Sequence, residues 1–229
     1  DIGLAISMVD IGWGFLVGSS IIIILFIAEV WGGWIRIISF REVVVPGESL
    51  VINLLWDVLF HIAVSLNEEI SVRGWILVNT AIYIKTLGAS AATAMVLAVL
   101  LQSGMFALMH LGSPGASRVG LMNLVVGGTV AALNVFLSGG LSFSLGWHFG
   151  WNIFMGHLLG LSTSGIPMSA KLISIVPHPS KEVLHGGKFG PEQSPLATPT
   201  YLLGCVALVL IYGTSGIGTW HQRLSFVTI

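Results

Sequence analysis

The sequence predicts an all-α, polytopic transmembrane helical bundle, and three observations lead to this fold class. Of the 229 residues, 55% are hydrophobic and only 8% are charged, whereas a soluble domain carries about 25% charged residues. The mean hydropathy is +0.94. Apolar runs recur along the chain, and since one crossing takes about 20 residues, there is room for roughly six to seven spans and little else. The ordinary soluble enzyme classes are therefore excluded.

The charge balance and the cysteine content exclude two further classes. The chain contains nine Lys and Arg residues and ten Asp and Glu residues, which gives a net charge of −1. Such a chain lacks the basic surface of a nucleic-acid-binding protein. Cys205 is the single cysteine, so the chain cannot form an intramolecular disulfide.

The first half of the chain contains three apolar runs. The first expected span covers residues 11–28, and Trp31 follows it like an interfacial anchor. The second apolar run, 50–66, meets a charged cluster at 67–73, and apolar sequence resumes at 74–87. This pattern allows either two short helices or one long, bent helix.

Four further spans are expected after residue 88, at 89–111, 119–137, 141–161 and 201–217. The glycines within 125–132 indicate close helix packing. The alternation typical of strands is not evident. We expect a single membrane domain over 1–229, with a motif core at 68–152 and a polar loop at 163–199.

The charged cluster holds the first candidate site residues. A charge inside a bilayer is costly, so ionisable groups within spans are functional candidates. Glu69 and Arg73 are four residues apart, on one helix face, and can pair. Glu68 points about 100° away and lacks that partner, so it could serve as a general base. The alternative is that all three lie in a loop at the membrane surface.

Two later spans add further polar groups. His110 lies four residues after Phe106, and His148 lies four residues before Asn152. Spacing of this kind places both members of a pair on one helix face. His148 and Asn152 could donate hydrogen bonds to a developing oxyanion. The alternatives are a capping or packing role for His110 and a helix–helix hydrogen bond for the second pair.

Taken together, three spans supply a carboxylate, two imidazoles and an amide. Such a set can activate water and stabilise a tetrahedral intermediate. Hydrolysis of an amide bond is the chemistry that this combination favours.

These three motifs, in this order, resemble the signature motifs of the CPBP family, which comprises CAAX prenyl endopeptidases and bacteriocin-processing enzymes, also called Abi proteins. The motifs are Glu68-Glu69-x-x-x-Arg73, Phe106-x-x-x-His110 and His148-x-x-x-Asn152. The segment 186–192 is also similar to one seen in bacterial members.

The resemblance implies an intramembrane glutamic-type endopeptidase. In that family's terms, Glu68 activates water with the help of His110, and His148 and Asn152 form the oxyanion site. Glu69 and Arg73 form a structural pair. The expected substrate is a peptide or lipidated protein held at the lipid bilayer, with prenylated CAAX tails as one option. No cofactor, metal or nucleic acid is expected, and the zinc-protease motif His-Glu-x-x-His is absent.

Two other functional classes stay open at this point. One is a haem or pigment carrier, because His61, His110, His148 and His157 all lie in apolar runs. The other is a non-catalytic binding, assembly or immunity subunit, which could belong to a larger membrane-protein complex. We expect a multi-pass protein of a prokaryotic plasma membrane.

Overall fold

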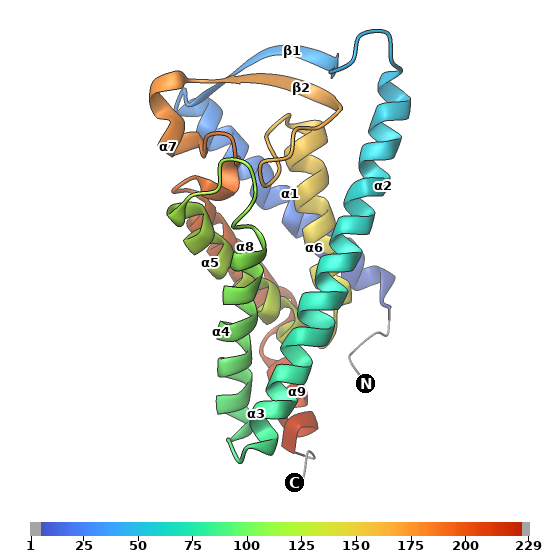
Figure 1. The fold of residues 1–229 in the computed structure, drawn as a ribbon. Helices are drawn as coiled ribbons and strands as arrows, with labels where there is room; N and C mark the ends of the chain where they lie inside the picture. The colour runs from blue at the N-terminus through green and yellow to red at the C-terminus, as the bar shows by residue number, and fades with distance from the viewer. Residues whose placement is uncertain (1–5, 226–229) are drawn as a thin grey trace.

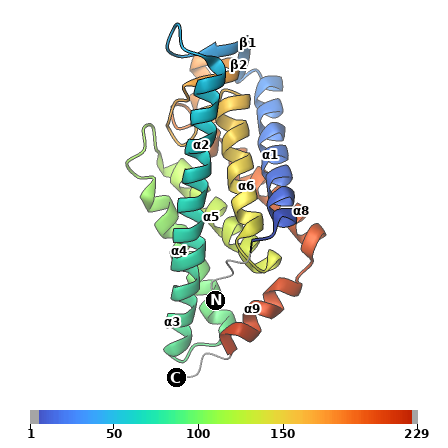
Figure 2. The same cartoon turned by 90° about the vertical axis from the view of Figure 1, so that its right-hand side faces the viewer.

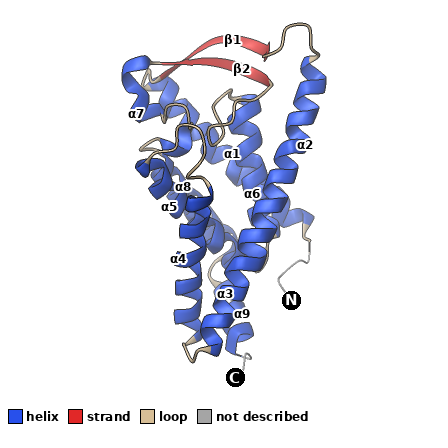
Figure 3. Cartoon of the chain, in the orientation of Figure 1, coloured by secondary structure: helices blue, strands red, loops and turns tan. Residues whose placement is uncertain are grey.

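The computed structural model describes residues 6–225 as a helical bundle with a two-stranded sheet at one end (Figures 1 and 3). The long helices are α1 (Met8–Trp31), α2 (Leu50–Glu68), α4 (Ala91–Met109), α5 (Arg118–Ser138) and α8 (Ala197–Tyr212). The shorter ones are α3 (Val78–Thr86), α6 (Ser142–Ile153), α7 (Glu182–His185) and α9 (Ser215–Ser225). Two π-helical segments, η1 (Glu69–Leu77) and η2 (Phe154–Leu158), extend α2 and α6.

Serine caps explain where four of the long helices begin. In each case the hydroxyl of the residue before the helix accepts a hydrogen bond from a backbone N–H in the first turn, which satisfies a donor that has no partner within the helix. The capping residues are Ser7, Ser49, Ser90 and Ser117.

Within residues 6–225, four helices are long and apolar enough to cross a membrane, or five if the bent pair α8 and α9 counts as one span. The chain is thus an integral, multi-pass membrane protein, but the expected six to seven spans are not confirmed. Residues 50–86 form one continuous 37-residue helix rather than two. The expected span at 141–161 contains the 12-residue α6 and the five-residue η2, which together are short for a crossing.

The last predicted span, 201–217, extends beyond the end of helix α8. The helix ends at Tyr212, and α9 leaves at an angle of 86°. Gly213 has φ +63°, a backbone conformation that favours glycine, and it allows the sharp change of direction.

The sheet was not predicted. Strand β1 (Ile35–Val43) pairs antiparallel with β2 (Ala170–Pro177), from Ile35 opposite Pro177 to Val43 opposite Ala170. Most side chains of β1 are exposed on both faces of the strand. The sequence therefore lacks the alternation of apolar and polar residues that predicts a strand with one buried face. The segment 163–199 is therefore folded around β2 and the short helix α7, and it is not a plain polar loop.

The most closely packed pair of helices is α1 and α6, which lie side by side in Figures 1 and 2. Gly14 and Gly18 of α1 face Gly146 and Gly150 of α6. A Cβ atom added at Gly146 would lie 2.0 Å from the carbonyl oxygen of Ile11. Small residues spaced by four let two backbones approach closely. Close packing was predicted for 125–132, and Gly128 there does lie against Ser103 of α4.

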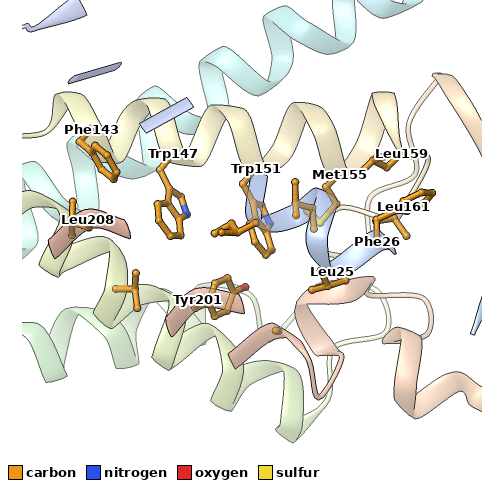
Figure 4. Packing of buried hydrophobic residues seen from close by; sticks show 14 of the residues in the cluster. Leu25, Phe26, Phe143, Trp147, Trp151, Met155, Leu159, Leu161, Tyr201 and Leu208 are labelled. Atoms are coloured by element: carbon orange, nitrogen blue, oxygen red, sulfur yellow. The ribbon is translucent and has the colours of Figure 1, made fainter. Parts of the chain in front are cut away.

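The largest hydrophobic cluster joins α1, α6 and α8 (Figure 4). Trp147 and Trp151 of α6 lie on the side of that helix that faces α8, and the rings of Trp151 and Tyr201 are 5.1 Å apart. A second cluster fills the space between α3, α4, α5 and α9. The largest cluster buries one side of α6 in the bundle, whereas α2 exposes large apolar side chains such as Leu55, Trp56 and Leu59.

Candidate active site

The two adjacent glutamates lie where the regular helix α2 passes into the π-helical segment η1. Glu68 ends α2 with its side chain 18% exposed, whereas Glu69 is 1% exposed. Local π-helical turns are frequent at functional sites. The junction gives the two carboxylates different surroundings, one in the protein interior and one at the edge of a cavity.

Glu69 is the centre of a buried polar cluster. Arg73 Nη1 donates to Glu69 Oε1 at 3.2 Å, and Ser144 Oγ donates to Oε2 at 2.6 Å. His148 Nδ1 lies 2.9 Å from Oε1. The Arg73 guanidinium also stacks on the Phe106 ring, 4.1 Å from its centroid. We call these residues the Glu69 cluster. They satisfy a charge pair that would be costly to bury alone.

Hydrogen-bond acceptors determine which ring nitrogen carries the proton in two histidines. A carboxylate only accepts, so His148 must donate from Nδ1 to Glu69. His110 Nδ1 lies 2.9 Å from the Phe106 carbonyl oxygen and donates to it. In the neutral form of each ring, the lone pair is therefore on Nε2. His148 Nε2 lies 3.8 Å from Glu68 Oε2.

A cavity of about 250 Å³ lies between α2, α4, α6 and the loops around 164 and 192. Four of its lining residues are the predicted catalytic set: Glu68, His110, His148 and Asn152. A smaller space of about 60 Å³ adjoins it and is lined by Glu69 and Arg73, among others. Both are large enough for water molecules next to polar groups.

All seven residues singled out in the sequence thus lie at or beside one cavity. The charged cluster at 67–73 is helical, and Glu69 and Arg73 are buried, so the alternative of a surface loop is wrong. Phe106 has a double role, because its carbonyl oxygen orients His110 and its ring contacts Arg73.

A second polar cluster lies closer to the sheet, and we call it the Asp57 cluster. Asp57 Oδ2 accepts from Ser169 Oγ at 2.8 Å and from the Ala170 N–H at 3.1 Å, and it lies 3.4 Å from His157 Nδ1. His157 Nε2 is 3.1 Å from His61 Nδ1, which also contacts the Asp57 carbonyl oxygen at 3.0 Å. His61 lines the same cavity as Glu68.

The contact between these two histidines does not favour a pigment site. A haem or chlorophyll ligand needs a ring nitrogen that faces open space. The ring centroids of His61 and His157 are 4.8 Å apart, which leaves no room for a macrocycle between them. Within residues 6–225, no group of three or more His, Cys, Asp or Glu side chains is arranged to hold a metal ion.

Two residues of the site were missed in the sequence. Ser144 lies four residues before His148, so helical spacing could have placed it on the same face. Glu192 lines both cavities, but it comes from the segment after β2, and nothing in its local pattern indicates this location. The similarity of 186–192 to bacterial CPBP proteins was the only signal there.

Comparison with known proteins supplies one match. A model of the family described as type II CAAX prenyl endopeptidase Rce1-like matches residues 50–154. That range runs from the first residue of α2 to the first residue of η2 and contains all seven motif residues. No curated protein and no solved structure matches the chain.

Proposed function

We propose that this chain is an intramembrane endopeptidase, because residues 50–154 match the model of the Rce1-like, type II CAAX prenyl endopeptidase family. It would hydrolyse a peptide bond of a membrane-associated or lipidated protein or peptide. The observation that carries this proposal is the shared cavity of Glu68, His110, His148 and Asn152. Of the two adjacent glutamates, Glu68 is the one that the Arg73 ion pair leaves available.

In this mechanism Glu68 is the general base. Its carboxylate removes a proton from a water molecule in the cavity, and the resulting hydroxide attacks the carbonyl carbon of the peptide bond. His110 assists by accepting a hydrogen bond from the same water at Nε2, since its Nδ1 proton is held by the Phe106 carbonyl oxygen.

The oxyanion would be stabilised by Asn152 and His148. The Asn152 side-chain amide is a donor in either protonation state of its neighbours. His148 can donate from Nε2 only as an imidazolium, because Glu69 already accepts its Nδ1 proton. The Glu69 cluster therefore positions His148 and provides the negative charge that such an imidazolium needs nearby.

The location of the cavity supports a substrate that approaches from the bilayer. One wall is α2, whose outer side exposes Trp56 and Leu59. A lipid-anchored or membrane-embedded peptide could reach Glu68 along this helix without leaving the apolar phase. The proposed setting is a prokaryotic plasma membrane.

The experiment that tests the proposal is a membrane peptidome comparison. Cells would carry the wild type, Glu68→Gln, or Glu42→Gln as a control at an exposed glutamate of β1, at matched expression. New peptide termini with the wild type and the control, but not with Glu68→Gln, would support proteolysis and identify the substrate. Identical peptidomes, with Glu68→Gln still rescuing a deletion phenotype, would overturn it in favour of a binding or assembly subunit.

A further inference from the structure

Glu192 lines the proposed catalytic cavity together with Glu68 of α2. It lies in the short turn η4 (Pro191–Gln193), and its side chain is 7% exposed. Asn123 of α5 anchors this turn, because its Nδ2 donates to the carbonyl oxygens of Glu192 and Ser194, both at 3.0 Å. A carboxyl group is thus held at a fixed place in the cavity wall.

A tight turn directs two donors at this carboxyl group. Ser164 donates to Glu192 Oε2 from its backbone N–H at 2.9 Å and from its Oγ at 2.6 Å. Ser164 and Gly165 are the central residues of a turn closed by a bond from Ile166 N to the Thr163 carbonyl oxygen, and both have positive φ, +47° and +85°. Such a conformation is unfavourable for serine, and it occurs preferentially at functional sites.

Burial favours the neutral form of this carboxyl group, whereas the two hydrogen bonds from Ser164 favour the charged form. Both Ser164 bonds end on Oε2, which leaves Oε1 as the oxygen that carries the proton. Burial raises the pKa of Glu192, and the Ser164 bonds oppose this only in part. The titratable and charged groups that line the two cavities with it are His61 and Glu68 on α2, Glu69 and Arg73 on η1, His110 at the end of α4, His148 on α6 and Tyr201 on α8.

We propose, on the basis of the endopeptidase function above, that Glu192 is the general acid that protonates the leaving amine. Glu68 takes one proton from water, and the new C–O bond forms at the carbonyl carbon. When the tetrahedral intermediate collapses, the C–N bond breaks and the nitrogen takes the proton from Glu192 Oε1. The second water proton stays with the product acid. Proton transfer from Glu68 to Glu192 through cavity water restores the starting state.

The other polar groups of the cavity are less suited to this step. His110 commits its Nδ1 proton to the Phe106 carbonyl oxygen, and His148, whose Nδ1 proton is held by Glu69, uses the Nε2 proton of its imidazolium for the oxyanion in the mechanism above. Glu68 and Glu192 line the same cavity of about 250 Å³. Two carboxyl groups in different environments are a common solution to acid–base catalysis at neutral pH.

The test uses two matched substrates in detergent-solubilised full-length protein. The first is a synthetic peptide that spans the cleavage site found by the peptidome comparison. The second is its thioester analogue, with sulfur in place of the scissile nitrogen. An amine must be protonated as it leaves, whereas a thiol of pKa about 8.5 can leave as the thiolate. Glu192→Gln should therefore slow amide cleavage about 10²- to 10⁴-fold and thioester cleavage less than about 10-fold.

The pH profile gives a second readout. The wild type should lose amide cleavage at alkaline pH as Glu192 deprotonates, and Glu192→Gln should lack this contribution to the alkaline limb. Glu182→Gln, at an exposed glutamate of α7, is the matched control and should behave as wild type. Ser164→Ala should reduce amide cleavage selectively, by a smaller factor.

Three results would overturn the assignment: equal losses on both substrates, no loss on either, or an unchanged alkaline limb in Glu192→Gln. The isosteric Gln retains an acceptor for Ser164, and thioester turnover itself reports that the variant is folded. A wild type that cleaves neither substrate would instead refute the endopeptidase function, so the two failures are distinguishable.

Discussion

The Glu69 cluster and the Asp57 cluster connect the same two helical segments in two different ways. In each, a carboxylate on the long helix 50–86 meets an imidazole on the helical segment 142–158: Glu69 with His148, and Asp57 with His157. The first cluster contains a cation, Arg73, and the Glu69 and Arg73 side chains are each 1% exposed. In the second, the Asp57 side chain is 16% exposed and its partners are hydroxyl, amide and imidazole donors.

The difference indicates that the two clusters have different roles. Both border the same cavity, which is lined by His61 of one cluster and His148 of the other. A buried ion pair costs much to break, because removing one partner leaves the other charge without compensation. A partly exposed carboxylate with neutral donors can lose a bond at a moderate cost. The Glu69 cluster therefore holds His148, which we propose to be catalytic, in place, and the Asp57 cluster ties α2 to the start of β2.

The largest effect is expected from Glu69→Gln. The change leaves the Arg73 guanidinium buried without a counter-charge, which should lower the free energy of unfolding by about 3–5 kcal/mol. His148 also loses its carboxylate acceptor, so peptide cleavage should be abolished. The thermal unfolding midpoint in detergent and the peptidome comparison check both statements. A variant as stable as the wild type would contradict the view that the ion pair is essential to the fold.

The double variant Glu69→Gln/Arg73→Met separates stability from function. It removes both charges, and a buried ion pair can often be replaced by groups without charge at little net cost. We expect it to recover at least about 2 kcal/mol of the loss seen in the single variant. Activity should stay absent, because His148 still lacks a carboxylate partner. Recovery of cleavage together with stability would show that Glu69 does not position His148.

A smaller effect is expected from Asp57→Asn. The amide oxygen can still accept from Ser169 and Ala170, so the main loss is the charged character of these bonds, worth about 1–2 kcal/mol. Cleavage should fall less than about 10-fold, because this cluster contacts neither Glu68 nor His148. Ser169→Ala, which removes one donor only, is the matched control for thermal unfolding. A loss of stability and of cleavage as large as that expected for Glu69→Gln would show that the two clusters contribute equally to both.

The two clusters also differ in how far the sequence predicts them. Glu69 and Arg73 are neighbours on one helix, so their pairing follows from their spacing, and the order of the three motifs indicates the family. The contact between Glu69 and His148 is long-range, but both residues belong to recognisable motifs. The Asp57 cluster depends on Ser169 and Ala170, whose position is set by the pairing of β1 with β2.

That pairing could not be predicted because neither strand alternates between apolar and polar residues, and 126 residues lie between Val43 and Ala170. The same reason hides Glu192, which reaches the cavity only because the chain returns after β2. The contact of α1 with α6 is easier to predict from the sequence. Gly14-x-x-x-Gly18 and Gly146-x-x-x-Gly150 have the spacing of close membrane helix pairs. The expected six to seven spans are not confirmed, because hydropathy does not distinguish a span from a short buried helix.

The smallest effect is expected from His61→Gln, and this variant tests most directly whether the Asp57 cluster differs in role from the Glu69 cluster. His61 lines the cavity but contacts only His157 and the Asp57 carbonyl oxygen among the polar partners of the structure described here. A glutamine amide can donate to the same carbonyl oxygen, so the change should cost less than about 1.5 kcal/mol. Peptide cleavage should change less than threefold, and its pH profile should keep its shape, since the proposed proton transfers use Glu68 and Glu192.

His110→Gln is the matched comparison, because it alters a histidine of the same cavity and should reduce cleavage about 10²-fold or more. A shift of the pH profile in His61→Gln, at unchanged stability, would instead place the Asp57 cluster in the path of the proton.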